Sequence, residues 1–366
     1  MKVSVITFQN NFNYGSALQT FATYMKFKEY ANDVEVIDYT KNMTYTSKSY
    51  IIRRFKENPI KGLINFPAAL RWQYILNKFI CENLNVSPNR YNYDEDFVNF
   101  PLHDGIYCTG SDQVWNTSHN NGILSPLYLG FVPSGKRKIT YASSIGSESL
   151  SQEDIDGTMK YIKQYEKISV REESAVKILK EQYGYQNVIQ IVDPILAMSP
   201  EFWIQHTKNT SNPAFKVEYI LIYNFAYDAE FESYAKALSK KTGLPLVRIC
   251  PSFLQALFGC GKSVIIPDIF EFVSLVRHAK YLLTDSFHGT AFSMNLNTEP
   301  IVIYPKKFST RLSSILSLLG AEQRVAKDFS DFDVINRPVD WSHVNSVLEK
   351  ERERVDEFLQ SIFHAK

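Results

Sequence analysis

Short apolar runs alternate along the chain with longer segments whose apolar positions recur at helical spacing. The apolar runs predict buried strands at 2–7, 34–37, 104–109, 138–142, 167–170, 188–192, 219–223, 245–249, 264–266, 281–283 and 301–304. The amphipathic segments predict helices at 17–30, 70–82, 152–165, 172–183, 228–241, 267–277, 288–297, 310–319 and 339–364. Strands that alternate with helices in this way are typical of an α/β fold built on parallel sheets.

A polar stretch at 199–213, punctuated by prolines, separates two halves of this pattern. The length of 366 residues also suits two domains of ordinary size. We therefore predict an N-terminal domain at 1–198 and a C-terminal domain at 199–340, with the C-terminal helix of 341–366 packing back on the first domain. Residues 41–100 are aromatic and basic, and we interpret them as an insertion that covers one side of the first domain.

The densest group of reactive side chains lies in Tyr281–Asn295, where a predicted strand runs into a predicted helix. Thr284, Asp285 and Ser286 offer hydroxyl and carboxylate oxygens suited to cap the helix that His288, Gly289 and Thr290 open. Backbone N–H groups and the helix dipole make such a junction a ready site for an anion. His288 stands at its mouth with a side chain that can carry a proton near neutral pH. The alternative, which we weigh equally, is that His288 is a residue at a helix terminus that makes its hydrogen bond to a backbone carbonyl.

A second junction, Gly110–Asn116, places hydrogen-bonding groups and an aromatic ring at the carboxyl end of a strand. Ligands of open α/β sheets bind at this end of the strands. Asp112 can act there as a base toward a hydroxyl group, and Trp115 can stack against a sugar ring. The alternative is that Asp112 caps the following turn and Trp115 lies in the core.

Two more strand ends carry candidate ligand groups. After the first strand, Gly15 permits close approach of a ligand to the backbone, while the neighbouring asparagines can bind hydroxyl groups or build turns. Arg171 follows another strand, where its guanidinium can bind a carboxylate or phosphate through two hydrogen bonds. A salt bridge of Arg171 with Glu172 or Glu173 is the alternative.

Composition excludes several classes of protein. The 40 basic and 39 acidic residues nearly cancel, which argues against a non-specific nucleic-acid binder. The four cysteines form no CxxC pair, and we interpret them as reduced core residues of an intracellular protein. We predict no metal site. The segment Gly259–Ser263 is similar to the end of a phosphate-binding P-loop, but Ala256 stands where that motif needs a glycine, so we reject it.

The chain opens on a predicted strand rather than a signal peptide. Its apolar runs are all shorter than the roughly 20 residues that cross a bilayer. We therefore expect a cytoplasmic protein without a transmembrane segment. Peripheral contact with the inner face of the membrane stays open.

Several segments, taken in their order and spacing, resemble the polysaccharide pyruvyl transferase family. The matching segments are Asn13–Gln19, Gly110–Asn116, Ser169–Glu172, Asp193-Pro194, Asp285–Gly289, Thr298–Pro300 and Thr310–Ser314. The resemblance implies a GT-B-like fold, in which two Rossmann-like domains face each other across a cleft. It also implies transfer of the carboxyvinyl unit of phosphoenolpyruvate to a sugar of a bacterial surface polysaccharide or its precursor, as in capsule and exopolysaccharide synthesis. The product is a pyruvate ketal, phosphate is released, and no further cofactor is implied.

The resemblance implies roles for individual residues. We expect phosphoenolpyruvate in the C-terminal domain and the sugar acceptor, lipid-linked or not, on the side of 41–100. The family histidine carries over to His288, our candidate for the proton donor or phosphate partner. Asp112 is our candidate for the base because of its position after a strand, and not because of the resemblance. Ser286 stands where the family often has an arginine, so Arg311, Lys306 and Lys307 are candidates for the missing cation. The predicted substrate-binding residues are Asn13, Tyr14, Gly15, Ser111, Gln113, Trp115, Asn116, Arg171, Ser286, Gly289, Thr290, Lys306 and Arg311.

Two other functions fit the same pattern. A glycosyltransferase that uses a nucleotide sugar would place phosphates at the same helix start. A non-catalytic saccharide-binding protein would have less need for an arginine and a histidine at separate strand ends. The acceptor sugar and the pair of hydroxyls that the ketal bridges stay open.

Overall fold

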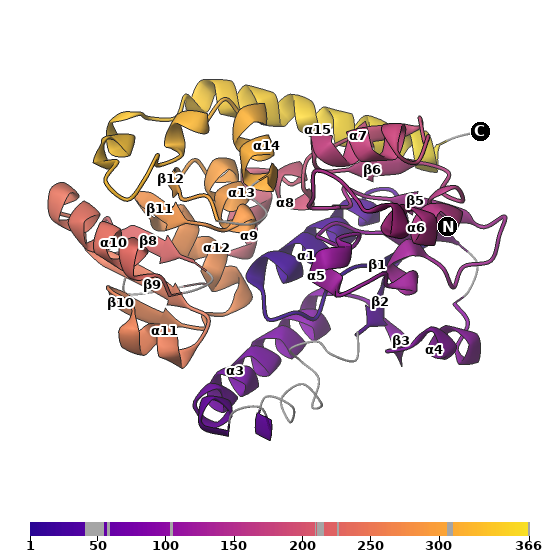
Figure 1. The fold of residues 1–366 in the computed structure, drawn as a ribbon, viewed down its shortest axis with the longest axis horizontal. Coiled ribbons are helices and arrows are strands. Elements are labelled where there is room, and N and C mark those ends of the chain that lie inside the picture. Colours follow the sequence, from indigo (N-terminus) through magenta and orange to yellow (C-terminus); the bar gives the residue numbers. More distant parts are fainter. Residues whose placement is uncertain are drawn as a thin grey trace. The chain divides into compact units, whose positions relative to one another are not determined.

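Two parallel β-sheets with flanking helices form the framework of the protein (Figure 1). The computed structural model describes residues 1–40, 55–56, 59–102, 105–208, 210, 216–224, 227–305 and 310–364. The chain divides into two compact units. The first unit comprises Met1–Tyr50, Leu76–Ala197 and Lys350–Lys366, and the second comprises Ile51–Ile75 and Met198–Glu349.

The sheet of the first unit has the strand order β3-β2-β1-β4-β5, and its strands are parallel. These strands are β1 (Lys2–Ile6), β2 (Asp33–Tyr39), β3 (Val86–Tyr91), β4 (Ile106–Thr109) and β5 (Arg137–Thr140). Isolated bridges from Ile139 to Lys167 and from Ser143 to Val170 link β5 to the parallel pair β6 (Ile168–Val170) and β7 (Val188–Gln190). The central strands β1 and β4 are almost wholly buried, as expected where helices cover both faces of a parallel sheet.

Helices and short helical turns connect the strands of the first unit. They are α1 (Tyr14–Lys28), α4 (Asp94–Asn99), α5 (Thr117–Asn120), η1 (Ser125–Tyr128), α6 (Gln152–Ile162), α7 (Glu173–Glu181) and α8 (Pro194–Ala197). Ile155 and Ile162 of α6 and Ile178 and Leu179 of α7 pack in a core with Trp115. This core fixes the carboxyl ends of the strands from one side.

The second unit repeats the arrangement, with parallel strands in the order β10-β9-β8-β11-β12. The strands are β8 (Ile220–Tyr223), β9 (Leu246–Cys250), β10 (Lys262–Ile265), β11 (Tyr281–Thr284) and β12 (Glu299–Val302). The helical elements are α9 (Pro200–His206), α10 (Ala229–Thr242), α11 (Phe253–Phe258), α12 (Ile269–His278), α13 (Phe287–Asn295), α14 (Thr310–Leu318), η3 (Glu322–Arg324) and η4 (Phe332–Asn336). β10 begins within the segment that is similar to a P-loop, and the next helix, α12, starts only after that strand, so the P-loop geometry is not formed.

Each sheet has a topological switch point. In the first unit the chain moves outward from β1 through β2 to β3 and then returns to β4 on the other side of β1. In the second unit it moves from β8 through β9 to β10 and then returns to β11 on the other side of β8. Loops leave the sheet in opposite directions at such points, and ligands of open α/β sheets bind there. The loops after β1 and β4, and after β8 and β11, are therefore the places to look for a site.

Two helices contribute to both units. Residues of α3 (Pro59–Asn83) up to Ile75 belong to the second unit, and those from Leu76 onward belong to the first. The helix α15 (Trp341–Phe363) passes into the first unit at Lys350. Within that unit Arg352 donates to the Leu196 carbonyl at 3.2 Å, and Arg137 donates to the Ile362 carbonyl at 2.8 Å. The end of the C-terminal helix thus packs on the first unit.

The region 41–100 differs from the expected insertion. Its last third contains β3, an edge strand of the main sheet, while the described residues among 51–75 group with the second unit. Residues 41–54 lie outside the described residues. The expectation was wrong because β3 carries Pro88 and polar residues, a pattern that an edge strand tolerates but that hides it in the sequence. Cys81 also differs from expectation, since it is exposed rather than in a core.

Candidate active site

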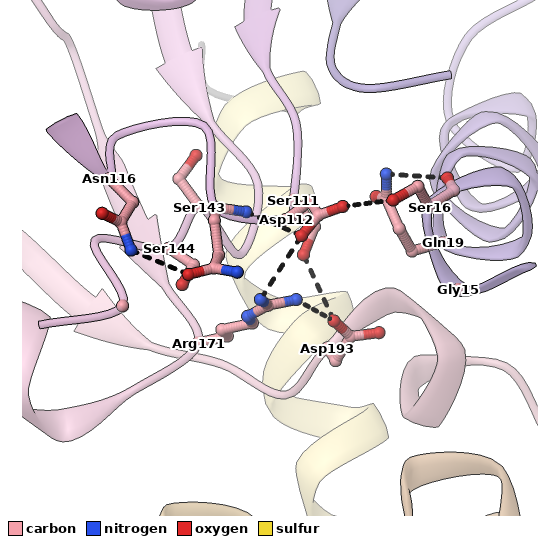
Figure 2. A network of polar contacts seen from close by, with 12 residues as sticks. Gly15, Ser16, Gln19, Ser111, Asp112, Asn116, Ser143, Ser144, Arg171 and Asp193 are labelled. Carbon is pink, nitrogen blue, oxygen red and sulfur yellow. Dashed lines mark hydrogen bonds and ion pairs between the residues drawn. The ribbon is translucent and has the colours of Figure 1, made fainter. Parts of the chain in front are cut away.

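Polar side chains gather at the carboxyl ends of the strands in the first unit (Figure 2). Ser16 lies in the first turn of α1, which follows β1, and Asp112 follows β4. Arg171 and Glu172 follow β6, and Asp193 lies between β7 and α8. These five residues are named here the Arg171 cluster. It includes the switch point between β1 and β4.

Neighbouring groups hold the Asp112 carboxylate on both oxygens. The Ser16 hydroxyl donates to Oδ2 at 2.6 Å. The backbone N–H of Gln113 donates to Oδ1 at 2.8 Å, and the Arg171 guanidinium lies 3.8 Å from that oxygen. Arg171 also donates to Asp193 at 2.7 Å. The guanidinium therefore orients two carboxylates that arrive from different strands.

Three carboxylates surround this guanidinium, since Glu172 Oε2 lies 3.7 Å from Arg171 Nε. Burial alone lowers the pKa of Arg171, but attraction by Asp193, Asp112 and Glu172 outweighs it, and the pKa is raised. With the carboxylates ionised, the cluster carries more negative than positive charge. Such a group attracts a proton donor, such as a sugar hydroxyl, and repels a polyanion.

Asp112 is the most accessible carboxylate of the cluster. Its side chain is 10% exposed, against 2% for Glu172 and 0% for Asp193. Its φ of 76° lies in the left-handed region, where a non-glycine residue pays of the order of 1 kcal/mol. The Ser144 N–H donates to the Asp112 carbonyl at 3.0 Å and helps to hold this conformation. Strained backbone of this kind is common at functional residues.

Glu172 holds the loop after β5. Its Oε1 accepts hydrogen bonds from the Ser144 hydroxyl at 2.8 Å and from the N–H groups of Ile145 and Gly146 at 2.8 and 2.9 Å. Gly146 has a φ of 65°, and a Cβ atom there would lie 2.7 Å from Gln113 Oε1. This loop thus packs against the one that carries Asp112. Glu172 is a bracing residue of the cluster.

Arg171 does not have the setting expected of an anion clamp. Its side chain is 1% exposed, and its shortest ion pair is with Asp193. The alternative interpretation, a salt bridge within the protein, describes it better, although Asp193 rather than Glu172 is the main partner. The reason is electrostatic. Three nearby carboxylates already more than balance the positive charge of Arg171, so a trianion such as the expected phosphoenolpyruvate would be repelled.

Trp115 lies in the core, and its expected role as a stacking surface for a sugar is wrong. The side chain is 1% exposed, and its ring stacks on Tyr128 with centroids 5.5 Å apart. The indole N–H donates to the Leu127 carbonyl at 3.1 Å. Burying so large an apolar ring with its N–H satisfied is favourable, and this outweighs its position beside polar residues in the sequence.

Ser111, Gln113 and Asn116 contact one another or the cluster. The Ser111 hydroxyl donates to Asp193 at 3.3 Å. The Asn116 amide donates to Gln113 Oε1 at 2.7 Å, and its own oxygen caps α5. These contacts hold the loop that carries Asp112.

Asn13, Tyr14 and Gly15 build the start of α1. The Asn13 side chain caps the helix by accepting from the N–H groups of Gly15 and Ser16, at 2.8 and 3.3 Å. Tyr14 is fully buried, and Gly15 is buried in the first turn. The cap sets the position of Ser16, which in turn holds Asp112. The expected contact of this loop with a ligand stays a prediction.

A second cluster lies where β11 meets α13 in the second unit. The Ser286 hydroxyl caps the helix by accepting from the Gly289 N–H at 3.2 Å, which confirms the predicted cap. Thr284 donates to the Tyr223 carbonyl at 2.6 Å and accepts from the Ser286 N–H at 3.0 Å. The residues Ser286–Thr290 are named here the α13 start. It is tied to both strands of the switch point, β8 and β11.

His288 and Arg311 bring basic groups to the α13 start. His288 is 5% exposed, and its ring centre lies 5.2 Å from that of Phe287. The Arg311 guanidinium carbon lies 5.5 Å from the centre of the same Phe287 ring. One cation proposed from the sequence therefore belongs to this cluster. Lys306 and Lys307 lie outside the described residues.

Gly289 is required by close packing. A Cβ atom at this position would lie 2.9 Å from Thr284 Oγ1 and 3.2 Å from the Tyr223 ring. The Thr290 hydroxyl donates to the Ser286 carbonyl at 3.0 Å, so Thr290 stabilises the first turn. Hydrogen bonds and close packing thus hold the first turn of α13, which presents the positive end of the helix dipole.

The sequence missed Ser16, Glu172 and Asp193 as site residues. Ser16 and Asp193 lie in segments that carry the family resemblance, and each follows a strand. Position at a strand end was therefore the available signal. The contacts of Ser16 with Asp112 and of Asp193 with Arg171 span 96 and 22 positions in the chain and could not be inferred from spacing, whereas Glu172 is adjacent to Arg171.

Within the described part of the chain, no group of three or more His, Cys, Asp and Glu residues is arranged to hold a metal ion. None of the described helices combines the length and apolar character needed to span a membrane.

Known structures with the same architecture are GT-B enzymes. The chain is 10% identical to S. aureus MnaA, solved with UDP, covering 100% of this chain and 97% of that one at a TM-score of 0.58. It is 10% identical to a putative UDP-N-acetylglucosamine 2-epimerase from Listeria monocytogenes, with 100% and 97% coverage and a TM-score of 0.55. It is 11% identical to the UDP-GlcNAc 2-epimerase of Neisseria meningitidis bound to UDP-GlcNAc, covering 99% of this chain and 100% of that one at a TM-score of 0.52. At these identities the likeness shows the fold alone, which is GT-B.

No curated protein of similar sequence was found. The model of the polysaccharide pyruvyl transferase family matches residues 13–307, which include both the Arg171 cluster and the α13 start. The match covers most of the chain, and the two Rossmann-like units agree with the fold expected from the resemblance. The chain is a transferase that belongs to the polysaccharide pyruvyl transferase family.

Proposed function

We propose that this transferase moves the carboxyvinyl unit of phosphoenolpyruvate to a sugar of a bacterial surface polysaccharide or its precursor, with release of phosphate. The observation that carries the proposal is the family match over residues 13–307, which contains both clusters. Each cluster suits one part of the reaction. The capsule or exopolysaccharide context and the cytoplasmic location belong to the same proposal.

The α13 start supports binding of the donor. Phosphoenolpyruvate carries a carboxylate and a phosphate, which favour the positive end of a helix dipole and a nearby guanidinium. Ser286, Gly289 and Thr290 fix the first turn of α13, and Arg311 packs on the adjoining Phe287. Ser286 stands where the family often has an arginine and carries no charge. We assign to Arg311 the positive charge that this arginine would supply. His288 gives a proton to the methylene carbon of the donor or contacts its phosphate.

The Arg171 cluster supports activation of the acceptor. Asp112 takes the proton of one sugar hydroxyl while the oxygen of that hydroxyl bonds to the central carbon of the donor. Phosphate then leaves, and the second hydroxyl attacks the same carbon to close the ketal. One hydroxyl proton ends in the new methyl group and the other on phosphate, so the reaction needs no oxidant or reductant. Ser16 and Arg171 position the Asp112 carboxylate.

Phosphate release from phosphoenolpyruvate across a panel of galactosides, mannosides and N-acetylhexosaminides tests the proposal. We expect release with at least one acceptor and a higher melting temperature in the presence of phosphoenolpyruvate. The change His288→Ala should lower the rate by about 10²–10⁴-fold if His288 is the proton donor. His278→Ala, at the C-terminal end of α12 in the same unit, is the matched control and should keep the rate.

A rate within a few-fold of wild type for His288→Ala would remove His288 from catalysis. If neither turnover nor thermal protection by phosphoenolpyruvate is seen, while a nucleoside diphosphate protects the fold, the protein is a nucleotide-sugar glycosyltransferase instead. Saccharide binding with no turnover of any donor would mark a binding protein.

A further inference from the structure

The first half of α3 is apolar on its exposed face as well as on its buried face. Leu63, Phe66, Leu70 and Tyr74 recur at spacings of three and four residues, so they form one stripe about 16 Å long. Leu63 is 68% exposed, Leu70 48% and Tyr74 60%. These four residues are named here the α3 stripe. A helix with a water-facing side normally carries polar residues on that side.

Contacts within the second unit fix which face of α3 is exposed. The Trp72 indole N–H donates to the Pro251 carbonyl at 3.0 Å. Arg71 pairs with Asp268 at 2.6 Å and donates to the Ile266 carbonyl at 3.3 Å. A rotation of α3 that hid the stripe would break these bonds. The exposed stripe is therefore a fixed feature of this unit.

A neighbouring element, α11, is also apolar on its exposed side. Leu257 is 77% exposed and Phe258 is 64% exposed. α11 begins two residues after Pro251, the residue that accepts the hydrogen bond from Trp72. Two adjoining elements of one unit thus expose large apolar side chains, which marks a surface for interaction.

The charge around the stripe in the sequence is strongly positive. Residues 41–80 contain eight lysine or arginine residues and one glutamate, whereas the whole chain has a net charge of +1. The remainder of the chain is therefore acidic overall. Among the described residues near the stripe, Lys56 and Lys78 are exposed. This excess of positive charge in the sequence favours an anionic partner and disfavours a second copy of the chain, which would bring like charges together.

We propose that the α3 stripe inserts into the interface of a membrane that contains anionic lipids. Apolar and aromatic side chains flanked by lysine and arginine are the features of helices that lie in the plane of a membrane. Tyrosine and phenylalanine suit the boundary between headgroups and acyl chains, and the basic residues attract the anionic headgroups. The stripe holds the second unit at this surface, in the manner of a peripheral protein.

Flotation of the full-length protein with vesicles tests the proposal. We expect binding to vesicles of phosphatidylcholine and phosphatidylglycerol in a ratio of about 2:1, and weaker binding at high salt or to phosphatidylcholine alone. The triple change L63S/L70S/Y74S should reduce binding at least about tenfold, because it removes most of the inserted apolar surface. Val98→Ser is the matched control, since Val98 is 80% exposed on α4 of the first unit and should not matter.

The triple variant is expected to fold, because its three side chains are already exposed, and circular dichroism checks this. His288→Ala should bind vesicles as the wild type does, so the proposed membrane contact can fail or succeed separately from the proposed reaction. Wild-type protein that stays unbound to the anionic vesicles would overturn the proposal, as would a folded triple variant that binds unchanged. A dimer in solution that the triple change dissociates, without vesicle binding, would assign the stripe to a second copy instead.

Discussion

The three carboxylates of the Arg171 cluster differ in what they contact. Asp193 has no exposed side-chain surface and makes the shortest ion pair with Arg171, so it balances a buried charge. Glu172 accepts from two backbone N–H groups and braces the loop after β5. Asp112 alone combines partial exposure with a left-handed backbone and a hydrogen bond from Ser16. This division agrees with the proposed role of Asp112 as the base and gives the other two carboxylates a structural role.

The isosteric changes Asp112→Asn and Asp193→Asn separate these roles. Asp112→Asn removes the proposed base, and we expect turnover to fall by about 10²–10⁴-fold while phosphoenolpyruvate still protects the fold. Asp193→Asn leaves Arg171 with less compensation, and we expect the free energy of unfolding to fall by about 3–5 kcal/mol. Turnover and denaturant unfolding of both variants measure this. Equal turnover of Asp112→Asn and wild type would show that another group takes the proton.

At the scale of elements, both candidate clusters lie where a helix begins beside a topological switch point. The sequence located these junctions well, because buried strands give continuous apolar runs and the caps are serine or asparagine. It missed β3, whose pattern includes Pro88, and the first half of α3, which contains Pro59 and Pro67. Proline usually breaks a helix interior, and an exposed apolar stripe removes the amphipathic signal.

Gly289→Ala tests the packing of the α13 start. A Cβ atom would force the Thr284 hydroxyl to shift and would press on the Tyr223 ring, so we expect a loss of about 1–3 kcal/mol in the free energy of unfolding. Phosphoenolpyruvate binding should also weaken, since the first turn must shift. Gly157→Ala is the matched control: it lies inside α6, and its Cβ would lie 2.5 Å from the terminal methyl of Ile123, an exposed side chain that can turn away. Calorimetry of both variants decides the point, and equal stability would contradict the packing argument.

For the whole molecule, the sequence predicted two α/β domains and the return of the C-terminal helix to the first one. The division of the described chain at Ala197 and Met198 lies beside the predicted boundary. The sequence pattern did not predict that α3 is shared between the units or that Arg171 is surrounded by carboxylates. Both features depend on contacts between distant parts of the chain. Periodicity reports which face of an element is buried, but not which element buries it.

Transfer in heavy water, with the acceptor that supports most phosphate release, tests the central claim most directly. A ketal requires that the methylene of phosphoenolpyruvate takes a proton from the site, so its methyl group should carry one solvent deuteron, visible by mass spectrometry and NMR of the purified sugar. We predict a product with one deuterium in that methyl group and an equal amount of phosphate. A sugar that carries a vinyl ether without deuterium, or one extended by a hexose from a nucleotide sugar, would contradict the account.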